Sequence, residues 1–131
     1  MPLEHIYPED LRRPPTYVPV VRVTGGSTVY LSGQVPVGLD GNIVGEGDFG
    51  TQARQVFANL RSALAAVGGD FSNLARMTTY IVNYSPELRE ALGAARSEAM
   101  GDAHCASTLL GVQSLAVPGY LIEVEAIAVI D

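Results

Sequence analysis

The sequence has few basic residues. Lys and Arg together number 8 among 131 residues, against 14 Asp and Glu, so the formal net charge at pH 7 is −6. Basic residues adjoin only at Arg12 and Arg13. Because nucleic-acid-binding surfaces normally need a basic patch, we expect this chain to have no nucleic-acid partner.

Cysteine, histidine and long apolar runs are also scarce. The single cysteine, Cys105, excludes a disulfide within the chain and is typical of a reducing compartment. With only His5 and His104 beside it, we expect no metal site, since such a site needs about four ligands. No apolar run reaches the roughly 18 residues of a membrane span, and the N-terminus lacks the basic start of a signal peptide. We therefore expect a cytoplasmic protein without a membrane partner.

The length and composition predict one domain over residues 1–131. The hydrophobic fraction of 47% and the charged fraction of 17% are typical of a compact protein with a single core. Four prolines fall within the first fifteen residues, namely Pro2, Pro8, Pro14 and Pro15. We expect residues 1–15 to form an irregular proline-rich arm.

The end of the chain is a long apolar segment that starts at a Pro118-Gly119 turn. Residues 120–130 are rich in β-branched side chains and predict a strand with both faces mostly apolar. Such a strand is typically covered on both sides. Glu123 and Glu125 share one of its faces, and buried carboxylates are costly unless paired or hydrogen-bonded. Either both lie near the solvent-exposed end of the sheet, or one lines a pocket, where it acts as an acid or a base or binds a water molecule.

The remaining patterns predict a β-β-α-β-α-β-β order and therefore an α+β fold with a mixed sheet. Residues 16–23 and 28–32 read as a hairpin around Gly25-Gly26. A helix capped by Asp48 ends at Gly68-Gly69, and a second begins at Ser85-Pro86-Glu87 and ends at Gly101. Strands are expected over residues 74–82 and 106–114.

Two helices can cover only one face of this sheet. The closing strand is apolar on both faces, so the second face needs another cover. Because no further residues are available for it, that cover is most simply another copy of the chain. The pattern predicts a homo-oligomer.

Four motifs resemble those of the RidA/YjgF family of reactive-intermediate deaminases. They are Leu31-Ser32-Gly33-Gln34-Val35-Pro36, Gln52-Ala53-Arg54-Gln55-Val56 with Asn59-Leu60, Thr78-Thr79-Tyr80-Ile81-Val82, and residues 122–129 of the closing strand. The resemblance runs from about Pro15 to the C-terminus. It implies a chorismate mutase-like fold, assembled as a barrel-cored homotrimer with pockets at the subunit interfaces. It also implies hydrolysis of enamines and imines, such as 2-aminoacrylate, without a cofactor.

The resemblance maps the family pocket onto residues of this chain only in part. Tyr17, Ser32, Gly33 and Glu123 match, and in the deaminases that glutamate positions the attacking water. The family arginine that clamps the substrate carboxylate falls on Ser107 or on Thr108, depending on the alignment, and neither is basic. A family asparagine falls on Leu92. Cys105, beside His104, is either a nucleophile with a depressed pKa or an inert cysteine, and the second is favoured.

These residues leave more than one function open. The first is a hydrolase acting on an imine, an enamine or a related labile metabolite, with Glu123 holding the water. Losing a bidentate charge pair would weaken carboxylate binding roughly tenfold to a hundredfold, so we expect little 2-aminoacrylate hydrolysis. The second is a non-catalytic trimer that binds or senses a metabolite. The third is an interaction role, chaperone-like or ribonucleolytic, and the acidic charge disfavours the ribonuclease.

Overall fold

The computed structural model describes residues 2–131, and the predicted arm contains a strand that the prolines obscured. β1 (Leu3–Ile6) pairs antiparallel with β2 (Val20–Val23) in a separate two-stranded sheet. Glu4 lies opposite Arg22 in this register, and the Arg22 Nε and Nη2 donate to Glu4 Oε1 at 3.0 and 2.8 Å. The expectation of an irregular arm was wrong for residues 3–6. Pro8, Pro14 and Pro15 lie between the two strands, so they do not interrupt the pairing of β1 with β2. Residue 1 is outside the described part of the chain.

The main sheet has four strands in the order β3-β6-β4-β5. They are β3 (Ser27–Gln34), β4 (Leu74–Val82), β5 (Ala106–Val112) and β6 (Ile122–Ile130). β4 and β5 are parallel, and β6 is antiparallel to both β3 and β4. The predicted mixed sheet is therefore confirmed.

The predicted hairpin of residues 16–23 and 28–32 was wrong. β2 pairs with β1, whereas β3 pairs with the closing strand β6. Gly25 and Gly26 both have positive φ, 74° and 73°, and they carry the chain from the small sheet into the large one. Glycine signals a change of direction, but it does not decide which strands pair.

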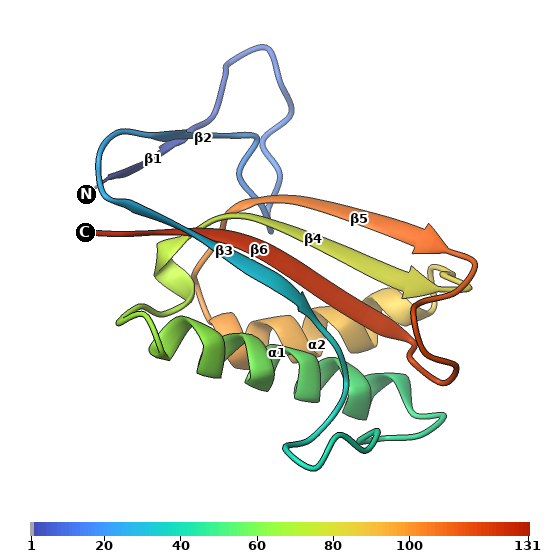
Figure 1. Ribbon diagram of the computed structural model, residues 1–131. Coiled ribbons are helices and arrows are strands. Elements are labelled where there is room, and N and C mark those ends of the chain that lie inside the picture. Colours follow the sequence, from blue (N-terminus) through green and yellow to red (C-terminus); the bar gives the residue numbers. More distant parts are fainter. Residues whose placement is uncertain (1) are drawn as a thin grey trace.

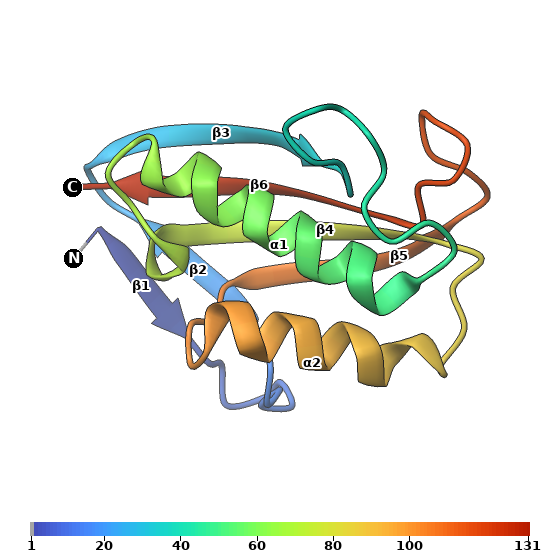
Figure 2. The ribbon, with the colours of Figure 1, turned by 90° about the horizontal axis from the view of Figure 1, so that it is seen from below.

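Both helices lie on one face of the sheet, as the pattern predicted (Figures 1 and 2). α1 (Phe49–Ala65) begins at Asp48, whose side chain accepts from Thr51 N at 3.2 Å, and a short 3₁₀ turn, η1 (Phe71–Asn73), leads into β4. α2 (Leu88–Met100) ends at Gly101, where φ is 56°. Both helices return the chain across the sheet between parallel strands.

The core lies between α1 and the middle of the sheet. Val56, Phe57, Leu60 and Leu64 of α1 are almost wholly buried, as are Ile122 and Val124 of β6. α2 packs mainly against α1 and stands off from β4 and β5. In the described residues no helix is long and apolar enough to cross a membrane.

Within this single chain the second face of the sheet is largely uncovered. Tyr30 on β3 is 78% exposed, and Ile127 and Glu125 of β6 share its face. The closing strand is thus covered by helices on one side only. The trimer implied by the family resemblance remains a prediction.

Candidate functional site

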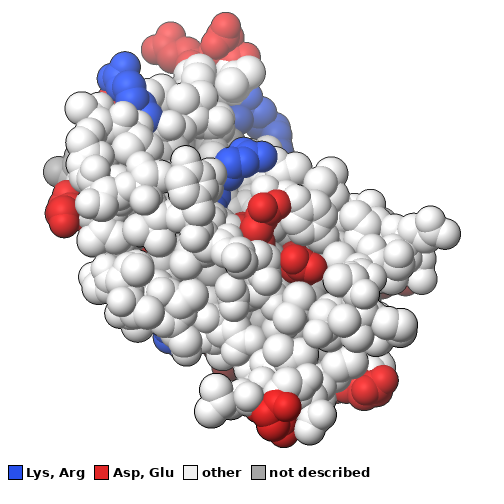
Figure 3. All heavy atoms as spheres, viewed as in Figure 1, with Lys and Arg blue, Asp and Glu red and all other residues white. Residues whose placement is uncertain are grey.

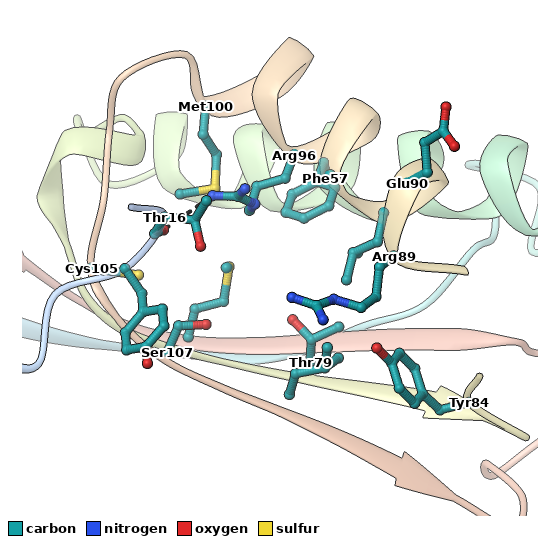
Figure 4. Close-up of a pocket in the computed structure, with 15 residues that line it drawn as sticks. Thr16, Phe57, Thr79, Tyr84, Arg89, Glu90, Arg96, Met100, Cys105 and Ser107 are labelled. Atoms are coloured by element: carbon teal, nitrogen blue, oxygen red, sulfur yellow. Dashed lines mark hydrogen bonds between the residues drawn. The ribbon is translucent and has the colours of Figure 1, made fainter. Parts of the chain in front are cut away.

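A cavity of about 760 Å³ lies between α2 and the strands β4 and β5, where the helix stands off from the sheet (Figure 4). The N-terminal segment closes one end of it and Tyr84 lies at the other. Its lining comprises Thr16, Tyr17, Phe57, Met77, Thr79, Tyr84, Arg89, Glu90, Leu92, Gly93, Arg96, Met100, Cys105, Ser107 and Leu109. The cavity is within the size range of small-molecule sites and mixes apolar walls with a few polar groups.

Two arginines of α2 reach into this cavity. Figure 4 shows the guanidinium groups of Arg89 and Arg96 in the space between the helix and the sheet. Arg96 Nη1 donates to the carbonyl oxygen of Thr16 at 3.1 Å, which fixes the half-buried side chain. Within residues 2–131, the one ion pair joins Arg22 to Glu4, so neither cavity arginine is neutralised by a carboxylate.

Sequence reasoning missed both arginines. The family resemblance pointed to Leu92 on the second helix and placed the substrate-clamping arginine only on the following strand, at Ser107 or Thr108. Arg89, Leu92, Gly93 and Arg96 follow the three-and-four spacing of one helical face. That spacing was the signal that could have placed the arginines beside Leu92.

Four residues singled out from the sequence do line the cavity: Tyr17, Leu92, Cys105 and Ser107. Ser107 pairs with Met77 across the β5–β4 ladder and lies on the helix side of the sheet with it. The cavity therefore carries a neutral hydroxyl on the strand and its positive charge on the helix.

The cysteine is a poor nucleophile in this setting. Cys105 is 2% exposed, and burial raises the pKa of its thiol to about 11, although Arg96 and Arg76 partly oppose that shift. A thiol with so high a pKa is almost wholly protonated at neutral pH, and the thiolate is the reactive form. The structure thus favours the inert alternative for Cys105.

Thr108 lies on the opposite side of the sheet from Ser107, because successive strand residues alternate. Its Oγ1 accepts a hydrogen bond of 2.8 Å from Arg76 Nη2, on the uncovered face. The two alignments of the family arginine therefore point to different faces, and of the two residues Ser107 lines the cavity.

Glu123 also lies on the uncovered face. It pairs with Tyr80 in the ladder between β6 and β4, while its neighbours Ile122 and Val124 are buried under the helices. Its carboxylate lies over Gly33, so close that a methyl group built on Gly33 would lie 1.8 Å from Glu123 Oε2. Partial burial, and then the charge of Glu125, raise the pKa of Glu123. Gly33 thus serves to make room for this carboxylate.

A second hollow of about 330 Å³ lies on the uncovered face beside these groups. It is lined by Tyr30, Leu31, Ser32, Arg76, Thr78, Glu125, Ala126 and Ile127. Glu125 accepts a hydrogen bond from the Tyr80 hydroxyl, which raises the pKa of Tyr80. Acidic and basic groups meet near the middle of the face seen in Figure 3, within a largely uncharged surface. Ser32, Gly33 and Glu123 therefore gather on one side of the sheet, and Tyr17, Leu92 and Ser107 on the other.

The described residues contain no cluster of three His, Cys, Asp or Glu side chains that could hold a metal ion. His104 and Cys105 adjoin, and His5 lies in β1 of the other sheet. The cavity, the second hollow and the Gly33–Glu123 contact offer carboxylates, hydroxyls and guanidinium groups.

Comparison with known proteins assigns the family. The model of the family described as Endoribonuclease L-PSP matches residues 11–130. The crystal structure of YyfB from Yersinia pestis, a protein of the conserved Rid family, matches with a TM-score of 0.92 at 34% identity, covering 99% of this chain and 100% of that one. The chain belongs to the RidA/YjgF family.

Two further relatives have individual names. The 2-iminobutanoate/2-iminopropanoate deaminase of Dermatophagoides farinae is 28% identical over 108 residues, which cover 81% of this chain and 80% of that protein. Protein DfrA of Myxococcus xanthus is 37% identical over 67 residues, so this chain matches only about half of its own length and half of DfrA, 51% of each. The predicted family and its α+β fold are therefore confirmed.

Proposed function

We propose that this RidA/YjgF protein hydrolyses an imine or enamine of a small 2-oxo acid in a site formed between two copies of the chain. The observation that carries the proposal is the division of the site residues between the two faces of the sheet. The cavity under α2 has cations and hydroxyls but no carboxylate directed into it, and the uncovered face has Glu123. The relative named as an imine deaminase supports the reaction class.

Glu123 is the residue that could activate water. Its raised pKa brings proton exchange closer to neutral pH, as general acid–base catalysis requires. As a water oxygen bonds to the C=N carbon, the carboxylate takes one proton from that water and delivers it to the nitrogen, which leaves a carbon bearing one hydroxyl and one amino group. The carboxylate then takes the hydroxyl proton and passes it to the same nitrogen. Breaking the C–N bond releases ammonia and leaves a C=O bond, so that an imine and water become a 2-oxo acid and ammonia.

A single chain cannot bring these groups together. Glu123 and Ser107 lie on opposite faces of one sheet, and a strand residue cannot cross to the other face without shifting register. Stacking the uncovered face of one copy against the cavity of a neighbour would unite Glu123, Ser32 and Gly33 with Tyr17, Leu92 and Ser107. Such a contact also covers Tyr30 and Ile127, and a closed ring of three copies repeats it.

Turnover of freshly generated imines tests the reaction. We expect ammonia release from at least one imine of a small amino acid, and its loss in Glu123→Gln. Glu98→Gln, an exposed charge on α2 outside the cavity, is the matched control and should retain turnover. 2-Aminoacrylate should be hydrolysed more slowly than by a deaminase whose strand carries the family arginine, because β5 has Ser107 at that position. Absence of turnover on every imine would refute the proposal.

Mixing two inactive variants tests whether the site is shared. Gly93 lines the cavity, and a Cβ atom added there would have no neighbour within 4 Å beyond the adjoining helix backbone, so Gly93→Trp should fill the cavity without unfolding α2. Co-assembly of equal amounts of Gly93→Trp and Glu123→Gln should restore about a quarter of wild-type turnover. In a shared site, the intact cavity of one variant then meets the intact Glu123 of the other in about one interface of four. Ala94→Trp, which is exposed on the same helix, is the control for Gly93→Trp. No recovery on mixing would place both halves in one subunit.

A second candidate function is metabolite binding without chemistry. The separation of Glu123 from the cavity favours it, because the cavity of one chain can hold an anion with no catalytic group nearby. In that case 2-oxo acids should raise the unfolding temperature of wild type and of Glu123→Gln equally, with no ammonia from any imine.

A further inference from the structure

We infer that Arg89 and Arg96 of α2 bind the two acidic ends of the substrate, which makes a dicarboxylic 2-imino acid the preferred substrate class. The inference rests on the proposed function and adds to it the identity of the ligand. It assigns to the helix the cation that the strand lacks at Ser107.

The positions of the two arginines suit a ligand with two separated charges. They are seven residues apart on one face of α2, with Leu92 and Gly93 between them. Seven residues correspond to about 10 Å along a helix axis. A single carboxylate cannot occupy both ends of such a stripe, whereas a diacid of four or five carbons can approach both guanidinium groups by way of their flexible side chains.

The charge balance of the cavity points to anions. The chain as a whole carries a net charge of −6, yet two of its eight basic residues face this one cavity. Glu90 belongs to the lining, but its carboxylate points away from the space between helix and sheet (Figure 4). Guanidinium groups bind carboxylates through paired hydrogen bonds, and such bonds strengthen where water is partly excluded.

The two arginines differ in how firmly they are held. Arg96 is half-buried, is tied to the Thr16 carbonyl, and lines the same cavity as the Ser107 hydroxyl. Arg89 is exposed, and its guanidinium lies above Thr79 at the other side of the cavity (Figure 4). We assign Arg96 to the carboxylate beside the reacting carbon and Arg89 to the second carboxylate, which makes Arg89 the specificity-determining residue.

The cavity is also larger than a monoacid needs. A volume of about 760 Å³ has room for a diacid of four or five carbons as well as for an imine of three or four. Gly93 keeps the wall between the arginines open, since a Cβ atom added there would have no neighbour within 4 Å beyond the adjoining helix backbone. The room therefore extends along the helix from Arg96 to Arg89.

Calorimetric titration of the assembled protein with two stable 2-oxo acids tests the inference. The probes are 2-oxoglutarate, a diacid, and 2-oxobutanoate, a monoacid, at one fixed ionic strength. Wild type should bind the diacid roughly tenfold more tightly, the effect of one added charge-assisted contact. Arg89→Gln should abolish that difference, Arg89→Lys should retain part of it, and Arg96→Gln should weaken both probes roughly tenfold. Arg54→Gln, an exposed α1 arginine outside the cavity, is the control and should change both affinities less than twofold.

Several results would overturn the inference: equal affinities for the two probes in wild type, an unchanged preference in Arg89→Gln with native circular dichroism, or a preference that Arg54→Gln also removes. Ammonia release measured in parallel separates this failure from that of the reaction. If monoacid imines are hydrolysed, Arg89→Gln does not change their turnover and the diacid is not preferred, then the proposed hydrolase is supported and the dicarboxylic substrate class is refuted. If the two probes bind with the expected affinities but no imine is hydrolysed, then binding of a diacid is supported and the hydrolase is refuted.

Discussion

The carboxylate of Glu123 occupies the space that a side chain on Gly33 would need. A methyl group built there would lie 1.8 Å from Oε2 and 2.7 Å from the carboxyl carbon. Gly33→Ala should therefore displace the carboxylate while the protein still folds, since the contact is with the end of a flexible side chain. We expect imine turnover to fall at least tenfold with a loss of stability of about 1 kcal/mol or less. Gly50→Ala, whose added methyl group would make ordinary contacts of 3.6 Å or more, is the matched control.

The raised pKa of Glu123 predicts a pH dependence of stability. Burial and Glu125 make the folded state hold this proton more tightly than the unfolded state does. The resulting stabilisation is complete below the ordinary glutamate pKa of about 4.3 and is lost as the pH rises through the raised value. The unfolding free energy of Glu123→Gln, from urea denaturation at several pH values, should therefore fall less than that of wild type as the pH rises above about 4. Identical pH dependence in the two proteins would contradict this prediction.

Cys105 should resist thiol reagents in the native protein. Its thiol is 2% exposed and its pKa is raised to about 11, so at pH 8 only about one molecule in a thousand carries the thiolate. We expect a disulfide reagent to label the folded protein slowly and the urea-unfolded protein at once. Labelling of the native protein at the rate of a free thiol would show that Cys105 is an activated nucleophile.

Gln52 should be important for stability because it joins two loops from inside the protein. Its side chain is fully buried, donates to the carbonyl oxygens of Gly45 and Gly119 at 3.1 and 3.0 Å, and accepts from Leu121 N at 2.8 Å. Gln52→Leu leaves these three groups without a partner, so we expect a loss of roughly 2–4 kcal/mol in the unfolding free energy. Gln113→Leu at an exposed position should change it by less than about 0.5 kcal/mol.

The uncovered face of the sheet predicts where an assembly variant should act. Ile127 lies on that face, whereas Val124 is fully buried against the helices. Ile127→Asp should therefore give a folded protein of lower mass by light scattering, whereas Val124→Asp should fail to fold, since a lone buried charge costs several kcal/mol. A wild-type protein that is monomeric at micromolar concentration would exclude the shared site.

The sequence by itself determined most of the local structure and the family. The strand at residues 74–82, the cap at Asp48 and the end of α2 at Gly101 depend on periodicity and backbone preferences within a few residues, so they could be read directly. The family motifs likewise identified Glu123 and Gly33 as candidate site residues. They did not predict that Gly33 makes room for the Glu123 carboxylate.

Only the tertiary structure decided which strands pair and which side chains share a cavity. β1 was hidden among prolines, and β2 pairs with it instead of with β3, because pairing depends on partners distant in sequence. Ser107 and Thr108 are consecutive, and that single step along the strand decides which face of the sheet each occupies. Arg89 and Arg96 became candidate ligands only once α2 was placed on α1 and away from β4 and β5, since helical spacing fixes which residues share a face but not what that face meets.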